Sequence, residues 1–224
     1  MTFSIVARCA STGQFGVAIS SSSPAVAARC AFARSGVGAV ASQNVTNPML
    51  GPSVLSRMEA GQGADTAVAE AIAEEDYPDF RQLLAVDATG GVSVHSGARA
   101  LGLWTSATGR DCASGGNMLA DIGVPAAIIA GFEAAQGDLG DRLIAALKAG
   151  LAAGGEAGPV HSAGLLVVDT EAWPYVDLRC DWTTGDPVAQ VAAAWEIYRP
   201  QAGDYVTRAK NPAGAPSYGV PGDS

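Results

Sequence analysis

The chain has 224 residues, of which 48% are hydrophobic and 16% charged, and its formal net charge is −9. This composition excludes a disordered chain and indicates a globular protein with a sizeable core. The acidic balance argues against nucleic acid as a partner, because basic surfaces bind phosphate backbones. No apolar run reaches the roughly 18 residues of a membrane span, and the first residues lack the pattern of a signal peptide. We therefore expect a cytoplasmic protein that binds neither membranes nor nucleic acid.

Metal-binding and cofactor-binding patterns are missing from the sequence. The two histidines, His95 and His161, have no second ligand at helical spacing, and the four cysteines include no CxxC pair. No serine stands in a GxSxG elbow, and the glycine-rich stretches lack the spacing of a phosphate loop. The sequence therefore predicts no metal and no cofactor.

The first half of the chain predicts strands, then helices, then a hairpin. Residues 2–9 and 15–20 predict a hairpin around a turn, 25–34 are ambiguous between helix and strand, and 36–44 predict a strand. Helices are expected at 52–60 and after Asp65, which we expect to cap the second one. The predicted second hairpin pairs 83–87 with 92–96, and 101–116 are expected to be irregular or short strands.

The second half predicts two helices, then a hairpin, then a last helix. Residues 118–136 have a helical pattern, and Asp138 is the predicted N-cap of the next helix. A third hairpin is expected at 162–170 and 175–182. Asp186 followed by proline predicts the start of a last helix.

Three hairpins and two groups of helices indicate an α+β fold. Two antiparallel sheets covered by helices on both outer faces use all of these elements, which predicts a four-layer αββα sandwich. We expect a single domain over 1–200 and an extended C-terminal tail over 201–224 that docks on the body or on a second subunit. The tail and the apolar composition favour a homodimer.

Thr2 is the strongest candidate for chemistry. If Met1 is removed, Thr2 carries both a free α-amine and a hydroxyl. The amine has a pKa of about 7.7–8.0 in model peptides, so it can accept the hydroxyl proton near neutrality. This arrangement makes a nucleophile without a separate histidine, and it leads to an amidohydrolase hypothesis. A threonine at position 2 is also an ordinary strand residue, and that alternative stays open.

Such a nucleophile also needs donors for the developing oxyanion. The stretch 114–119 offers Asn117 and flexible backbone N–H groups before a predicted helix. The end of the strand at 36–44 offers the amides of Gln43 and Asn44.

Several motifs together resemble one family. MTFSIVAR, GVGAVASQN, HSG, GGNML, AGGE…HSAGLLVV and APSYGVPGD occur in the order expected of the domain-of-unknown-function family 1028, which itself resembles a branch of the N-terminal nucleophile (Ntn) hydrolases. The resemblance implies an αββα sandwich. It also implies that Thr2 is the family's threonine, and that Gly116 and Asn117 form its glycine-asparagine turn. It implies no particular reaction.

The chain departs from the family pattern at 156–162. Family members usually have Asp-x-Arg-Gly-x-Gln-Ser there, whereas this chain reads Glu-Ala-Gly-Pro-Val-His-Ser, so the arginine and the glutamine are absent. A lysine near the nucleophile is also missing, and Arg29 is the basic residue we select in its place.

The sequence therefore predicts an Ntn-hydrolase-like amidohydrolase acting on a small amide or peptide. Thr2 and Asn117 are the predicted catalytic residues. Substrate-binding residues are predicted at Gly116, Arg29, Gln43, Asn44 and Ser162. The alternatives are a non-catalytic binding or structural protein that keeps the fold and retains Met1, and an enzyme that uses Cys9 or Cys112 as its nucleophile.

Overall fold

The strands of the protein form two antiparallel sheets. The computed structural model describes residues 2–219. The six-stranded sheet has the spatial order β10 (Pro174–Cys180), β9 (Ser162–Val168), β2 (Phe15–Ser21), β1 (Thr2–Arg8), β8 (Cys112–Asn117) and β7 (Thr105–Gly109). The four-stranded sheet has the order β3 (Ala31–Arg34), β4 (Gly38–Asn44), β5 (Arg81–Asp87) and β6 (Val92–Ser96).

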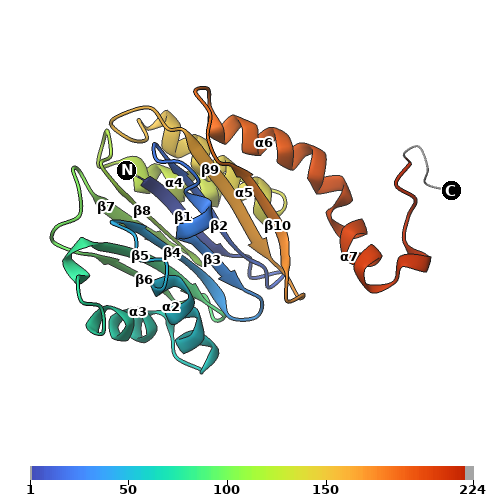
Figure 1. Ribbon diagram of the computed structural model, residues 1–224, viewed down its shortest axis with the longest axis horizontal. Coiled ribbons are helices and arrows are strands. Elements are labelled where there is room, and N and C mark those ends of the chain that lie inside the picture. Colours follow the sequence, from blue (N-terminus) through green and yellow to red (C-terminus); the bar gives the residue numbers. More distant parts are fainter. Residues whose placement is uncertain (1, 220–224) are drawn as a thin grey trace.

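The helices gather in groups around these sheets (Figure 1). The larger sheet packs against α4 (Val124–Ala134), α5 (Leu139–Ala152) and α6 (Pro187–Tyr198). The smaller sheet packs against α2 (Leu50–Glu59) and α3 (Ala64–Ala73). The short α1 (Ala27–Cys30) leads into β3, and α7 (Ala202–Lys210) follows α6. Single 3-10 turns occupy Pro78–Phe80, Arg199–Gln201 and Pro212–Gly214. The fold is therefore mixed α+β, with two antiparallel sheets as predicted.

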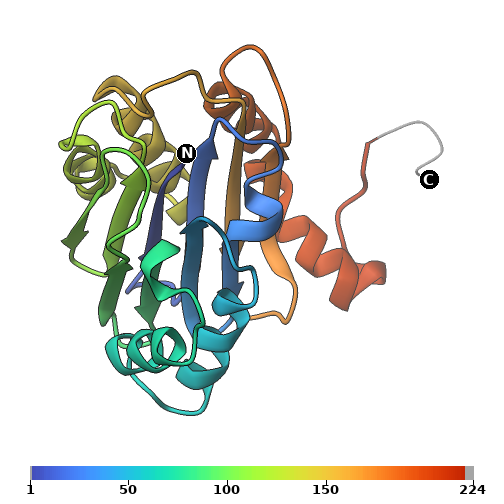
Figure 2. The same cartoon turned by 60° about the vertical axis from the view of Figure 1, so that its left-hand side comes forward.

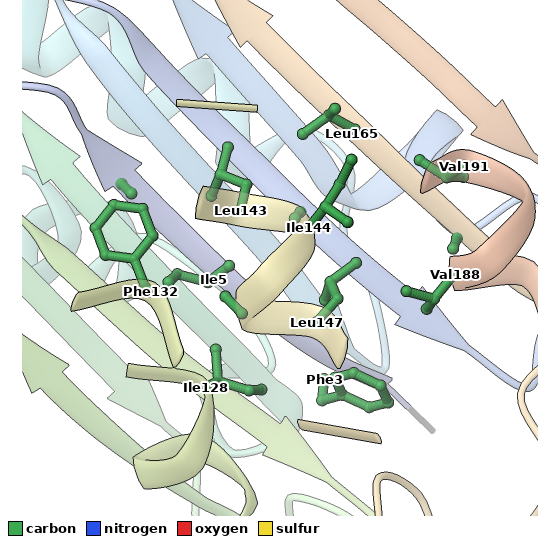
Figure 3. Close-up of a cluster of buried hydrophobic side chains, with 14 of the residues drawn as sticks. Phe3, Ile5, Ile128, Phe132, Leu143, Ile144, Leu147, Leu165, Val188 and Val191 are labelled. Atoms are coloured by element: carbon green, nitrogen blue, oxygen red, sulfur yellow. The ribbon is translucent and has the colours of Figure 1, made fainter. Parts of the chain in front are cut away.

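Strand β1 lies near the middle of the larger sheet and is buried on both faces. Successive side chains of a strand point to opposite faces. Phe3 and Ile5 contact the core beneath α4 and α5, where Figure 3 shows them with Phe132 and Leu147. Val6 belongs instead to the core between the two sheets. The alternation therefore directs Thr2 and Ser4, like Val6, toward the smaller sheet.

Two helix caps follow the sequence prediction. Asp138 forms a capping box with Asp141 at the start of α5. Asp186 accepts hydrogen bonds from the backbone N–H groups of Val188 and Ala189 at the start of α6. Each carboxylate satisfies backbone donors that the first helical turn leaves without partners. The three predicted hairpins are present as well.

Other predicted elements are wrong in detail. The N-cap of α3 is Gly63 rather than Asp65, and the N–H of Ala64 is bound by Asp87 from the distant strand β5. In the stretch 101–116, by contrast, the expected alternative of short strands is confirmed by β7 and β8. Residues 118–123 precede α4 instead of belonging to it.

The predicted extended tail begins with a helix, because 202–210 form α7. Figures 1 and 2 show α7 leading away from the body of the protein. The rest of the described tail, up to 219, contains the turn Pro212–Gly214, and its final residues, 220–224, lie outside the described residues. Within residues 2–219, no helix combines the length and the apolar character needed to cross a membrane.

Candidate active site

Thr2 is the first residue of β1 and is 4% exposed. Directly opposite residues in an antiparallel pair place their side chains on the same face. Thr2 pairs with Asn117 on β8, and β2 lies on the other side of β1. The hydroxyl of Thr2 donates to the hydroxyl of Ser21 at the end of β2, at 3.4 Å. Three strand ends therefore meet around the Thr2 hydroxyl.

A chain of polar contacts leads from Ser21 to Arg29. The hydroxyls of Ser21 and Ser23 lie 2.8 Å apart, and Nη2 of Arg29 donates to Ser23 Oγ at 2.7 Å. Nη1 of Arg29 donates to the carbonyl oxygens of Pro24 and Ala25. Arg29 thus holds the loop after β2 and reaches Thr2 only through two serines.

Ser162 supports the same loop from β9. Its hydroxyl donates to the carbonyl oxygen of Ser23 at 2.6 Å and accepts the N–H of Val26 at 3.2 Å. The side chain is fully buried. In this arrangement Ser162 fixes the backbone around Ser23.

A network of buried amides joins the two sheets beneath Thr2. Ser4 Oγ donates to Gln43 Oε1 at 2.6 Å, and Gln43 Nε2 donates to Gln82 Oε1 at 2.7 Å and to the carbonyl oxygen of Gly115. Gln82 Nε2 donates to Ser96 Oγ and to the carbonyl oxygen of Gly116. All polar atoms of the Gln43 amide therefore have protein partners, and Gln43 acts as structural support below the site.

The direction of this network fixes the orientation of Asn117. Backbone carbonyls only accept hydrogen bonds, so Gln43 and Gln82 must turn their NH₂ groups toward Gly115 and Gly116. Gln82 Oε1 is then an acceptor, and Asn117 Nδ2 donates to it at 3.2 Å. Asn117 Oδ1, which is fully buried, has no hydrogen-bond partner among residues 2–219. Buried acceptors without a donor are rare in native proteins.

Gly116 and Asn44, both predicted to bind substrate, make contacts that hold neighbouring parts of the chain in place. A Cβ on Gly116 would lie 2.5 Å from Leu119 Cδ2 and 3.1 Å from the carbonyl oxygen of Thr2. Asn44, with φ at +74°, donates to the carbonyl oxygen of Phe80 and accepts the N–H of Leu101. Gly116 thus allows close packing beside Thr2, whereas Asn44 ties together the loops that follow β4 and precede β5 and β7.

Glu156 is a buried acidic residue close to this group. Its carboxylate accepts the N–H of Ser22 at 3.1 and 3.2 Å, and the residue is 5% exposed. Burial raises the pKa of Glu156 to about 7, although the hydrogen bonds from Ser22 and the charge of His161 act in the opposite direction. Carboxyl groups with raised pKa values are frequent at functional sites.

The structure thus brings Thr2, Asn117 and Gly116 together, with Gln43 below them and Arg29 and Ser162 behind the loop after β2. Asn44 lies at the edge of the smaller sheet. The sequence prediction missed the contributions of Glu156, Gln82 and Ser23. A signal for Glu156 was present, since it holds the acidic position of the family segment at 156–162. Among residues 2–219, no group of three or more His, Cys, Asp or Glu side chains could hold a metal ion.

Comparison with known proteins identifies the family. Residues 2–191 match the family of unknown function DUF1028, and the chain belongs to this family. It is similar to the crystal structure of SPO2555 from Silicibacter pomeroyi, a DUF1028 protein, with 28% identity and a TM-score of 0.85 over 91% of this chain and 89% of that chain. It also aligns with Anbu (ancestral beta-subunit) from Yersinia bercovieri at 11% identity and a TM-score of 0.39, covering 89% of this chain and 95% of that one. No curated protein matches the chain.

Proposed function

We propose that the protein, after removal of Met1, is an Ntn-hydrolase-like amidohydrolase that acts on a small amide or peptide. In this proposal the two sheets and their outer helices form the four-layer αββα sandwich of that superfamily. Thr2 is the nucleophile and its freed α-amine is the base. The active form is then a processed chain that begins at Thr2.

One observation carries the proposal: Asn117 Oδ1, a fully buried acceptor opposite the candidate nucleophile, has no hydrogen-bond donor among the described residues. Leaving a buried acceptor unsatisfied destabilises a protein by about 1–3 kcal/mol. A substrate that brings an N–H to this position would satisfy the acceptor. Amides and peptides carry such a donor and simple esters do not, so the unpaired oxygen favours an amide substrate.

The proposed reaction has two half-reactions. The Thr2 hydroxyl attacks the carbonyl carbon while its proton passes to the α-amine, which then delivers it to the departing nitrogen as the C–N bond breaks. Water next cleaves the Thr2 ester, releases the acid and restores the hydroxyl. The second hydrogen of Asn117 Nδ2, together with backbone N–H groups, stabilises the oxyanion in both steps. This donor role is the one expected from the sequence.

A covalent label tests the proposal. The chain is prepared with Thr2 as its first residue by cleavage of an N-terminal fusion, and compared with chains that retain Met1 or carry Thr2→Ala. A β-lactone should acylate the first protein only, with the added mass on the peptide that contains Thr2. Thr2→Ser should remain reactive, since serine keeps both groups. Equal labelling of all forms, or labelling at Cys9 or Cys112, would refute catalysis at Thr2.

Processing in the native host is a separate question. An intact mass one methionine short of the full chain is the expected result. A full-length mass would leave the Thr2 amine acylated and unable to act as a base. The non-catalytic alternative, a binding or structural protein, would then be favoured.

A further inference from the structure

The backbone of Glu156 is fixed beside the end of β8. Leu119 and Glu156 form an antiparallel bridge, Ala120 N donates to the carbonyl oxygen of Gly155, and Ala157 N donates to that of Met118. These contacts begin one residue after Asn117. Figures 1 and 2 place the loop from α5 to β9 at the end of the sheet where β1 begins.

The side chain of Glu156 reaches the strand on the other side of β1. Its carboxylate binds the N–H of Ser22, which directly follows β2. Since β1 lies between β2 and β8, a residue attached to the ends of both neighbours crosses the amino-terminal end of β1. The carboxylate is therefore located where a free amine on Thr2 would emerge.

This carboxylate has no direct ion pair in the described part of the chain, although the charge of His161 acts on it from a distance. Within residues 2–219 no lysine, arginine or histidine lies at ion-pair distance from Glu156. A buried carboxylate is stabilised when it is paired or hydrogen-bonded. Removal of Met1 would create a cation with several N–H donors at the start of β1.

We propose that Glu156 binds the α-amine of processed Thr2 and orients it beside the Thr2 hydroxyl. This inference rests on the proposed function only in requiring that Met1 be removed. Glu156 is a positioning residue in this arrangement, because it acts on the carbonyl carbon only through the amine.

A contact between Glu156 and the α-amine would shift the pKa of the amine in a definite direction. A carboxylate favours the ammonium form of a neighbouring amine and so raises the pKa of that amine. The ammonium in turn lowers the pKa of Glu156, so the two groups titrate as a coupled pair. His161, which acts on Glu156, and Arg29, which holds the Ser21–Ser23 turn from its far side, are the other charged or titratable groups to control.

The test measures the amine without needing any catalysis. Chains that begin at residue 2 and carry Thr2→Ala are prepared with and without Glu156→Gln. Acetylation of the α-amine by acetic anhydride is then followed as a function of pH by mass spectrometry. Lys148 serves as an internal reference. Glu156→Gln should lower the apparent pKa of the α-amine by about one pH unit or more. Glu196→Gln, on the exposed face of α6, should leave this pKa unchanged. His161→Gln and Arg29→Gln should shift it by less than Glu156→Gln does.

Glutamine can still accept the N–H of Ser22, so the variant retains the contact that holds the turn, and its fold is checked by circular dichroism. An α-amine pKa that does not change with Glu156→Gln would overturn the inference. In the Thr2 protein, the β-lactone labelling rate should rise at lower pH in Glu156→Gln than in the parent. If Glu156→Gln shifts the α-amine pKa but the β-lactone does not label Thr2, the contact between Glu156 and the amine is supported and the amidohydrolase is rejected. Labelling by the β-lactone without a shifted α-amine pKa would support the amidohydrolase and reject the contact between Glu156 and the amine.

Discussion

Thr2 and Asn117 lie directly opposite each other at the ends of two neighbouring antiparallel strands, and both side chains face the space between the sheets. Asn117 is held in one orientation by Gln82, which is itself fixed by the carbonyl oxygen of Gly116, the hydroxyl of Ser96 and the amide of Gln43. A side chain so constrained is preorganised and requires little rearrangement when a substrate arrives. This relationship makes Asn117 the most informative site for mutation after Thr2.

Replacing Asn117 by alanine should slow acylation of Thr2 by about 10²–10³-fold, the usual effect of losing one oxyanion donor. The effect on stability should be small, because the loss of a bond to Gln82 is offset by the removal of an unsatisfied acceptor. Rates of β-lactone labelling and urea unfolding measure the two effects. Ser114→Ala is the matched control, since Ser114 is buried in the same strand and binds the backbone of Ser4. Equal labelling rates in both variants would remove Asn117 from the site.

In the chain that retains Met1, the unfolding free energy should depend on pH through Glu156. Its pKa is 4.5 as a reference value and about 7 in the folded protein, so between these values the folded state holds a proton that the unfolded chain has lost. Stability therefore falls as pH rises from 4.5 to 7, by about 3 kcal/mol in total.

Glu156→Gln should remove this dependence. The variant should be more stable than the parent at pH 8, and the difference should vanish near pH 4.5. Urea unfolding of both proteins at three pH values measures the effect, with Glu196→Gln as an exposed control. A constant difference across the pH range would contradict the assignment.

Asp87 should have the opposite pH dependence. Burial acts to raise the pKa of Asp87, but hydrogen bonds from Ala64, Thr89 and Gly91 outweigh it and hold the pKa below its usual value of 3.8. The stabilisation is therefore present above pH 3.8 and is lost as pH falls through the folded-state pKa. Asp87→Asn should destabilise the protein by about 1–3 kcal/mol at pH 7, as measured by urea unfolding. Asp65→Asn, at the exposed position once expected to cap α3, should have little effect.

The C-terminal arm, residues 203–219, should be dispensable for the fold. In α7 only Ala202 is buried, and the arm contacts the body through a stack of Tyr205 on Tyr198 and an ion pair between Lys210 and Glu171. Truncation after Ala202 should leave the melting temperature nearly unchanged. We expect the full chain to be a homodimer that uses this arm, so light scattering should report a dimer for the full chain and a monomer for the truncated one. A full chain of monomer mass would exclude the dimer.

Local signals made much of the fold predictable from the sequence. The carboxylates of Asp138 and Asp186 precede their helices by one residue, and the hairpins have turn residues between apolar runs. Signals of this kind act over a few residues, so they can be read without knowledge of the fold.

The errors arose where a distant residue supplies the partner. Asp87 satisfies the start of α3 across 23 positions of sequence and so displaces Asp65 from the capping role. Strand β8 has few large apolar residues, because Gly115 and Gly116 face buried amides and packed neighbours. A weak hydrophobic pattern therefore left this stretch ambiguous between irregular structure and short strands.

The candidate site was predictable only in part for the same reason. Thr2 and Asn117 are recognisable from motifs, yet the orientation of Asn117 depends on Gln82 from the other sheet. Glu156 lies 154 positions after Thr2, and strand order alone brings the two ends together. Contacts of this type follow from topology, which single-sequence patterns do not specify.

The amide layer between the sheets has a mechanical consequence. Apolar side chains such as Val6 and Leu84 would tolerate a small sliding of one sheet over the other, since their attraction has little directional character. The hydrogen bonds that join Ser4, Gln43 and Gln82 would not tolerate such sliding, because hydrogen bonds weaken steeply when donor and acceptor are displaced. These contacts therefore fix the position of one sheet relative to the other at the end of the interface where Thr2 lies, so Thr2 and Asn117 keep a constant spacing from the amides of the smaller sheet.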